Sequence, residues 1–442
     1  MTAPPHHEPQ SDTGKVGSLW EDLAPVASRF AALAGEQRAD VVFVGAGFLG
    51  LTAALTAARN GLSVAVVEAC QPGHGASGRN TGFVVPSLNS GLGPKQVTAL
   101  LGEDYGWRLM RLVARAGNAV ADLISENQIE CSPHWKGWLQ PGHCNKAEHM
   151  LKARLPLLLE AGVKAEFLDR GEMLARTGLP SLHGGLNILS GGQINPLAYA
   201  RGLARAVAAA RGRIFGDSPV TDIKRRGADW VVNTPSGSLV ANQVILTTNA
   251  MVGNLNPPLR SSIIPVRVFQ IATQRLHERY REAILPAGAA VTDTRRHTFA
   301  LRWSDDGRLV TGGLVSPAPD RLALARKTFV ERLRRFVPDL PEIRAEYAWS
   351  GQIAATMDAL PRMISIAPGL SGVIGCNGRG VALASALGVE TGRLVSGRTD
   401  EAAFVLPVTA PRKIPFSRLS GLAPHLWLPW SNTLDRIDAA WR

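Results

Sequence analysis

The sequence has few cysteines and no long apolar segment, and both absences narrow the possible classes of protein. Its four cysteines, Cys70, Cys131, Cys144 and Cys376, are far apart and form no C-x-x-C pair, which predicts neither a disulfide framework nor a metal site. No run of eighteen or more apolar residues predicts a membrane-spanning helix, and residues 1–16 lack the apolar run of a secretory signal. We therefore expect a cytoplasmic protein, because that compartment keeps thiols reduced.

The chain also lacks a recognisable nucleic-acid-binding module, although its formal net charge is +12. Its basic residues are scattered singly or as Arg-Arg pairs among apolar segments, with no basic stripe interleaved with aromatic residues. We expect no nucleic-acid partner and interpret the charge as a solvated surface. A role in attracting anionic ligands, including a cofactor diphosphate, stays open.

The length of 442 residues allows two domains, and 45% hydrophobic residues can supply a sizeable core. The 45 glycines and 29 prolines follow no fixed period, which indicates many tight turns in a globular protein.

A dinucleotide-binding signature begins at residue 39. The apolar run 39–44 predicts a buried strand, and it leads into Gly45-Ala46-Gly47-Phe48-Leu49-Gly50 and a helix-like segment 51–59. In G-x-G-x-x-G turns the first glycine permits the tight turn, the second lets the backbone approach a pyrophosphate, and the third lets the helix pack on the strand. A second apolar strand, 62–67, ends in Glu68, an acid placed to bind a ribose. FAD and NAD use the same contacts, so this unit alone leaves the choice between them open.

A loop rich in glycine and polar residues follows at 71–82, and we expect its backbone N–H groups and side chains to line a ligand. The glycine turn, Glu68 and the run Gly75-Ala-Ser-Gly-Arg-Asn80 together resemble the glycine oxidase and D-amino-acid oxidase superfamily of FAD enzymes, most closely its gamma-glutamylputrescine oxidase branch. Residues 193–204, 218–223, 244–250, 349–358 and 375–382 are similar to further motifs of that superfamily, in the expected order.

The resemblance implies an α/β fold with an FAD-binding Rossmann-like domain and a discontinuous antiparallel-sheet α+β substrate domain. It implies these cofactor-binding residues: Gly45, Gly47, Phe48, Leu49, Gly50, Glu68, Ala69, Ser77, Gly78, Arg79, Asn80, Thr81, Gly82, Val220, Thr248, Gly351, Asn377, Gly378, Arg379, Gly380 and Val381. The corresponding segments are an N-terminal extension (1–38), FAD-binding parts (39–94, 181–257, 349–399), substrate-domain parts (95–180, 258–348) and a C-terminal tail (400–442).

The chain departs from the superfamily at three places. Ile353 stands where amino-acid-oxidising relatives carry an arginine that clamps the substrate carboxylate, which favours an amine substrate, although an arginine elsewhere could replace it. Relatives with covalent flavin attach it through a cysteine shortly before the position of Thr356 or through a histidine in the first glycine loop. Here Ala354 and Ala355 precede Thr356, and Arg79 stands near the expected place of the histidine. His74 is nearby but is expected to face solvent, so we expect noncovalent FAD. Arg379 replaces the histidine of Gly-His-Gly and could stabilise reduced flavin, bind the diphosphate or face solvent.

The resemblance and the departures from it therefore imply an FAD-dependent oxidoreductase that oxidises a C–N bond of a polyamine, an acylated amine or a secondary amine, with O2 or another compound as electron acceptor. The alternatives are an amino-acid oxidase or dehydrogenase, another flavoenzyme chemistry such as hydroxy-acid oxidation, and a noncatalytic flavin-binding or tRNA-modifying protein. Candidate substrate-facing residues are Arg302, Tyr347, Trp349 and Gln352, and each is also a candidate packing or surface residue.

The tail contains apolar and aromatic residues at 414–419 and 426–430. They could lie at a membrane surface, or dock on the chain's own core or on another subunit. The sequence gives no oligomeric state.

Overall fold

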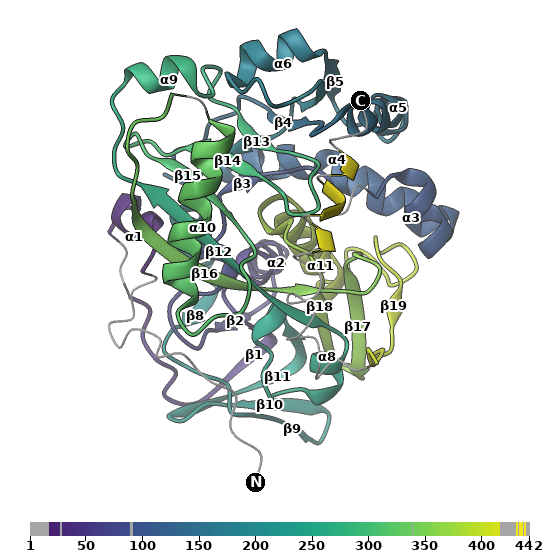
Figure 1. Ribbon diagram of the computed structural model, residues 1–442. Helices are drawn as coiled ribbons and strands as arrows, with labels where there is room; N and C mark the ends of the chain where they lie inside the picture. Colours follow the sequence, from purple (N-terminus) through teal and green to yellow (C-terminus); the bar gives the residue numbers. More distant parts are fainter. Residues whose placement is uncertain are drawn as a thin grey trace.

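In the computed structural model, described at residues 17–26, 29–88, 92–337, 339–415, 430–431, 433–435 and 437–438, the strands form two large sheets and one small one. The nine-stranded sheet lies in the lower half of Figure 1 and the eight-stranded sheet in the upper half. This mixed α/β architecture confirms the predicted fold class.

The nine-stranded sheet has a parallel centre because helices connect its strands across the faces. The four residues of β2 are all buried, which matches the apolar run that predicted this strand. The strands in their order across the sheet are β19 (Val408–Thr409), β17 (Arg362–Ala367), β18 (Leu370–Ile374), β11 (Gly237–Leu246), β1 (Gly35–Val44), β2 (Val64–Val67) and β8 (Arg213–Phe215), with β10 (Asp229–Asn233) paired to β11 and β9 (Asp222–Arg226) paired to β10.

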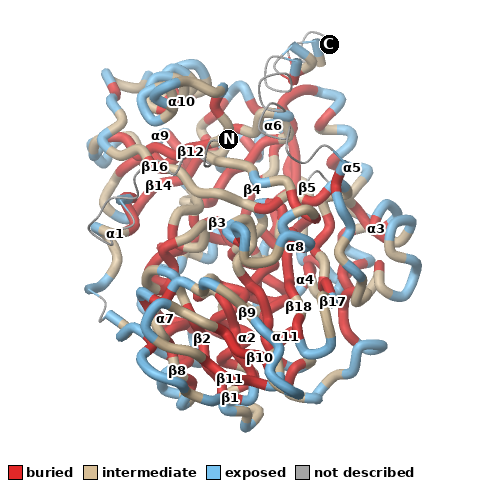
Figure 2. Tube along the Cα trace, turned by 90° about the horizontal axis from the view of Figure 1, so that it is seen from below, coloured by how far each residue is buried: buried red, intermediate tan, exposed pale blue. Residues whose placement is uncertain are grey.

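Two helices pack closely beside this sheet, α2 (Phe48–Arg59) and α11 (Ser385–Val395). Glycines make the contact possible, since a Cβ at Gly388 would lie 1.8 Å from Thr52 Oγ1 and a Cβ at Gly392 would lie 2.5 Å from Thr56 Cβ. Figure 2 shows the sheet and both helices among the buried parts of the chain. The edge at which β1 and β18 end is thus built on a rigid core.

The eight-stranded sheet is mainly antiparallel and is covered on its outer face by α10 (Arg321–Phe336). Its strands in order are β16 (Ala345–Ala355), β12 (Ile264–Thr273), β15 (Leu309–Gly313), β14 (Ala300–Trp303), β13 (Ala290–Thr292), β4 (Trp138–Pro141), β6 (Gly185–Ile188) and β5 (Ala165–Leu168). The small sheet pairs β3 (Phe83–Val84) with β7 (Gly192–Gln193).

The remaining helical elements are α1 (Leu19–Leu23), α3 (Pro94–Leu101), α4 (Glu103–Glu126), α5 (Asn145–Glu160), α6 (Arg170–Thr177), α7 (Pro196–Ala209), α8 (Pro257–Ser261) and α9 (Arg279–Ala283), with short turns η1 (Ala76–Gly78), η3 (Asn249–Met251) and the π-helix η4 (Gly380–Ala384). Within the described ranges, no helix combines the length and the apolar character needed to cross a membrane.

The predicted domain boundaries stay a prediction, but two strands of the eight-stranded sheet come from ranges assigned to the FAD-binding parts. β6 falls in the range 181–257 and β16 largely in 349–399, yet both pair within the eight-stranded sheet. The sequence motifs of these strands resemble parts of a cofactor site, and local motifs do not reveal which sheet a strand joins.

Most of the apolar tail residues, 416–429, lie outside the described residues. Ile414 is buried, and its N–H donates to the carbonyl of Ser261 at 2.8 Å. Farther along, Asp435 and Asp438 each pair with the guanidinium of Arg296 at 2.8 Å. The described parts of the tail therefore contact the chain's own surface.

Candidate functional site

Four neighbouring strands of the nine-stranded sheet end at one edge. β18, β11, β1 and β2 are adjacent and parallel, so their carboxyl ends point the same way. The chain leaves this edge at Gly375, Thr247, Gly45 and Glu68. In open α/β sheets ligands bind beyond the carboxyl ends of the strands. The edge therefore brings together the two glycine loops that are far apart in the sequence.

The turn between β1 and α2 requires glycine for steric reasons. Gly45 has a φ of +109°, a conformation that L side chains rarely adopt. A Cβ at Gly50 would lie 2.1 Å from the carbonyl oxygen of Gly45, and a Cβ at Gly47 would lie 2.9 Å from Ser77 Oγ. That hydroxyl accepts a hydrogen bond from the N–H of Phe48 at 3.1 Å. The backbone at the start of α2 therefore has no covering Cβ at these glycines, as close approach of a diphosphate requires.

Glu68 follows β2, and its carboxylate faces the same turn. It accepts hydrogen bonds from the N–H groups of Ala46 at 2.8 Å and Cys70 at 3.1 Å. Burial raises the pKa of the Glu68 carboxyl, while the N–H groups of Ala46, Cys70 and Ala69 act in the opposite direction. Its place beside the glycine turn is the one from which an acid can bind a ribose hydroxyl. Val220 lies between β8 and β9, packed on the adjoining core.

Asn80 fixes the shape of the first glycine loop. Its side-chain NH2 donates to the carbonyls of Ala76 at 3.1 Å and Ser77 at 2.7 Å, and its oxygen accepts from the N–H of Gly82 at 2.8 Å. Gly78 is packed so tightly that a Cβ there would lie 2.3 Å from a carbonyl oxygen of the same loop. These contacts pre-organise the loop beside the turn.

Arg79 extends from this loop toward His74. Its Nη2 lies 3.2 Å from His74 Nε2, and its Nε is buried without a hydrogen-bond partner among the described residues. His74 is 5% exposed, so the expectation that it faces solvent is wrong. Burial, together with the positive charge of Arg79, lowers the pKa of His74 to about 4. The neutral imidazole can therefore accept a hydrogen bond from the guanidinium.

Arg302 holds the end of the first glycine loop against the eight-stranded sheet. It is 1% exposed and donates to the carbonyls of Thr81 at 2.9 Å and Ile194 at 2.8 Å. Its guanidinium carbon lies 5.0 Å from the ring centroid of Trp20. This geometry favours a positioning role for Arg302, and its contact with a substrate stays a prediction.

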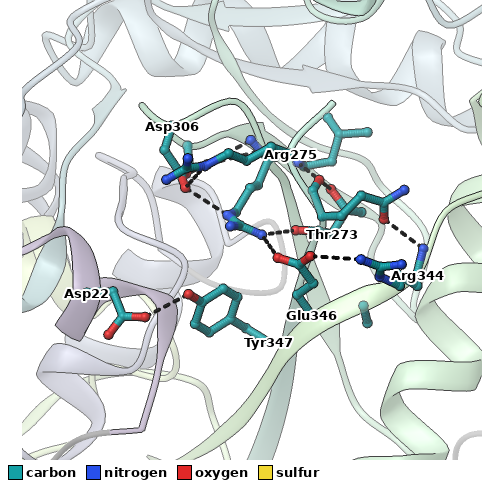
Figure 3. Close-up of polar contacts among 12 residues, drawn as sticks. Asp22, Thr273, Arg275, Asp306, Arg344, Glu346 and Tyr347 are labelled. Carbon is teal, nitrogen blue, oxygen red and sulfur yellow. Dashed lines mark hydrogen bonds and ion pairs between the residues drawn. The ribbon is translucent and has the colours of Figure 1, made fainter. Parts of the chain in front are cut away.

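Trp349 contacts the first glycine loop directly, and both Trp349 and Tyr347 contact α1. The indole of Trp349 donates to the carbonyl of Arg79 at 2.9 Å and packs edge-on against Trp20 at 6.0 Å. The hydroxyl of Tyr347 donates to Asp22 of α1 at 2.7 Å, as Figure 3 shows, and this bond raises the pKa of the phenol. Substrate contacts for both residues stay predictions.

Strand register places the predicted Gln352 and a second glutamine, Gln270, on opposite faces of the eight-stranded sheet. A Cβ at Gly351 would lie 3.3 Å from Arg79 Cβ, so this side of β16 looks toward the first glycine loop, and we call it the inner face of the sheet. Gln352 points to the opposite side because strand side chains alternate. Gln270 lies opposite Trp349 on the inner face, is 5% exposed, and has no partner for its Oε1 among the described residues. The geometry thus favours Gln270, which the sequence motifs did not indicate.

The second glycine loop is tied to the end of β16. The side-chain oxygen of Asn377 accepts a hydrogen bond from the N–H of Thr356 at 2.8 Å, and Asn377 has a φ of +49°. A Cβ at Gly378 would lie 3.3 Å from Ile353 Cδ1, so Ile353 is next to this loop. Val381 is buried in η4, which leads into α11.

The residues at this edge fit a bound dinucleotide. A glycine turn without side chains opens a helix, an acid lies beside it, and several buried polar atoms have no partner among the described residues. These atoms are Nδ1 of His74, Nε of Arg79, Oγ1 of Thr248 and Oδ1 of Asn249. A polar ligand would satisfy such atoms, which are rare in folded proteins.

The fold and this edge define a dinucleotide-binding enzyme with a second sheet beside the cofactor site. The family model described as DAO, FAD dependent oxidoreductase, matches residues 40–394, and the chain belongs to that family. The protein is thus an FAD-dependent oxidoreductase.

Relatives align with most of the chain. It is 29% identical over 422 residues to the Probable oxidoreductase OrdL of Rhizobium meliloti (strain 1021), spanning 95% of this chain and 97% of the relative. It is 30% identical over 361 residues to Gamma-glutamylputrescine oxidoreductase of Escherichia coli (strain K12), spanning 81% and 84%. The crystal structure of glycine oxidase from Geobacillus kaustophilus superposes with a TM-score of 0.69 at 22% identity, covering 85% of this chain and 99% of that one.

Gly50→Ala is expected to weaken FAD binding at least about tenfold and to lower the free energy of unfolding by about 1–3 kcal/mol, because the new Cβ would overlap the Gly45 carbonyl. Gly171→Ala is the control, since a Cβ there would meet only Asp169 Oδ1 at 3.4 Å. Flavin titration and denaturant unfolding measure both effects. Equal FAD affinity in the two variants would contradict the account of the turn.

The buried His74 is expected to make stability depend on pH. The pKa of His74 is about 4 in the folded protein and about 6.5 in the unfolded chain. Between these values the unfolded chain binds a proton that the folded protein does not, so the free energy of unfolding is highest above pH 6.5 and falls as the pH is lowered toward 4. The expected loss is at most about 3 kcal/mol. His74→Gln keeps an acceptor for Arg79 and is expected to flatten this part of the unfolding free-energy profile, whereas the exposed His149→Gln is expected to leave it unchanged. If His74→Gln left the pH dependence of the unfolding free energy unchanged, buried His74 would not be its cause.

Proposed function

We propose that the protein oxidises the C–N bond of an amine, in the class of polyamines, acylated amines and secondary amines. Bound FAD would supply the acceptor for a hydride at flavin N5. The resulting substrate imine would hydrolyse to an aldehyde and an amine, and the electrons would pass to O2 or another acceptor. The alternative within the family is oxidation of an amino acid.

The observation that supports an amine is the apolar residue beside the second glycine loop. Ile353 lies next to Gly378, at the place where the resemblance to amino-acid oxidases implies a carboxylate-binding arginine. An aliphatic side chain cannot make the paired hydrogen bonds of a guanidinium. A carboxylate on the reacting carbon would therefore find no partner in this side chain.

The inner face of the sheet can position an amine. The free Oε1 of Gln270 can accept a hydrogen bond from a substrate N–H, and the neighbouring β15 residue Gly312 makes room for this side chain, since a Cβ there would lie 2.7 Å from Gln270 Cγ. Arg79, held by His74 and Trp349, places a half-buried positive charge in the first glycine loop. Such a fixed charge can stabilise negative charge that develops as the cofactor is reduced.

The substrate class is tested by anaerobic mixing of the purified holoenzyme with matched amines and amino acids, while the flavin absorbance band is followed. Polyamines, acylated amines or secondary amines are expected to bleach the band at least about tenfold faster than α-amino acids, because Ile353 provides no carboxylate clamp. Faster bleaching by an α-amino acid would favour the alternative.

The flavin is expected to be noncovalent. No cysteine occupies residues 354–356, and Arg79 occupies the part of the first loop where the resemblance implies a linking histidine in covalent flavoproteins. Acid precipitation is expected to leave the flavin in the supernatant. A pellet that stays yellow would show a covalent bond.

A further inference from the structure

A row of directly opposed residues crosses the eight-stranded sheet on its inner face. Its members are Trp349, Gln270, Gly312, Ala300 and Thr292, in that order across β16, β12, β15, β14 and β13. At the end of the row, Thr292 Oγ1 accepts a hydrogen bond from the indole N–H of Trp138 at 3.1 Å. Trp138 in β4 therefore belongs to the same face as Gln270.

Two arginines from different elements interact electrostatically, and one of them stacks on Trp138. Arg379 reaches out of the second glycine loop, and its guanidinium carbon lies 5.4 Å from the ring centroid of Trp138. Arg154 comes from α5 and donates to the carbonyl of Leu92 at 3.3 Å. The Nε of each arginine is buried without a hydrogen-bond partner in the described part of the chain.

No acid in the described part of the chain balances the charges of this pair. Burial lowers the pKa of both guanidinium groups to about 10, and the positive charge of Arg154 adds to the lowering for Arg379, with no carboxylate opposing it. Both groups therefore stay charged at neutral pH. Two desolvated like charges without a counterion destabilise a fold, and a bound anion would offset this cost while satisfying both Nε–H groups.

We propose that Arg379 and Arg154, with Trp138 beside them, bind a carboxylate at the end of the amine substrate that is remote from the oxidised C–N bond. This inference rests on the proposed function, because it assigns a specificity subsite to the same reaction. Gln270 lies three strand spacings from Thr292, on the order of 10–15 Å. A carboxylate at that distance from the reacting nitrogen cannot be the α-carboxylate of an oxidised amino acid.

The position of the pair favours a substrate anion over the cofactor diphosphate. Arg379 is turned onto a tryptophan of the eight-stranded sheet, and Arg154 lies on α5, which packs against that sheet through Leu151. The glycine turn that suits a diphosphate lies instead at the start of α2, next to Ser77. The structure thus keeps the two anion-binding features on separate elements.

Octanedioate is the binding probe, because it has a terminal carboxylate and no amine to oxidise. Its affinity for the FAD-loaded protein is measured by titration calorimetry. Arg379→Gln and Arg154→Gln are each expected to weaken it at least about tenfold, since each removes charge-assisted hydrogen bonds. Arg379→Lys keeps the charge and is expected to retain part of the affinity, and the exposed Arg115→Gln is the matched control.

A second measurement compares anaerobic flavin bleaching by 8-aminooctanoate and octylamine, which differ in the terminal carboxylate. The carboxylate is expected to lower the half-saturating concentration at least about tenfold in the wild type and not in Arg379→Gln.

Octanedioate that fails to bind the wild type, or that binds the wild type and both glutamine variants equally well, would overturn the subsite. Loss of FAD with unchanged octanedioate binding in Arg379→Gln would also overturn it. If octanedioate binds as expected while no amine bleaches the flavin, the proposed function fails and the anion site stands.

Discussion

The whole site depends on the parallel pairing of β18, β11, β1 and β2. Parallel strands end at one edge of a sheet, so their loops meet there whatever their separation in the sequence. Gly45 and Gly375 both have positive φ values and turn the chain sharply at this edge. The contacts of α2 with α11 through Gly388 hold the helices that follow these turns in one rigid unit.

The second sheet is joined to this edge by side chains that bind backbone carbonyls. Arg302 and Trp349 come from the eight-stranded sheet, and both donate to carbonyls of the first glycine loop. Trp20 of α1 adds a third hydrogen bond, to the carbonyl of Asn80 at 2.7 Å. A loop fixed from several sides is pre-organised for its ligand, so binding loses less conformational entropy. The inner face is thereby held at a defined position relative to the cofactor edge.

The cofactor site could be predicted from the sequence because its parts are contiguous. The strand, glycine turn, helix and terminal acid around Gly47 and Glu68 lie within one short segment, and the steric need for glycine follows from local geometry. The roles of Gln270 and Arg154 could not be predicted in this way. Gln270 shares its strand with the polar residues Arg267 and Thr273, and only the register with β16 and β15 places it on the inner face. His74 looked like a solvent-facing loop residue because loops usually are exposed, and tertiary packing buries it.

The central claim is that this strand edge binds FAD through both halves of the dinucleotide. Folded protein freed of flavin should be titrated separately with FAD and with FMN, which lacks the adenosine half, while flavin fluorescence is followed. Each chain is expected to bind one FAD tightly and FMN at least about a hundredfold more weakly, because FMN offers no adenosine ribose to Glu68 and only one phosphate to the start of α2. A folded chain that takes up no FAD, or that binds FMN as tightly, would contradict it.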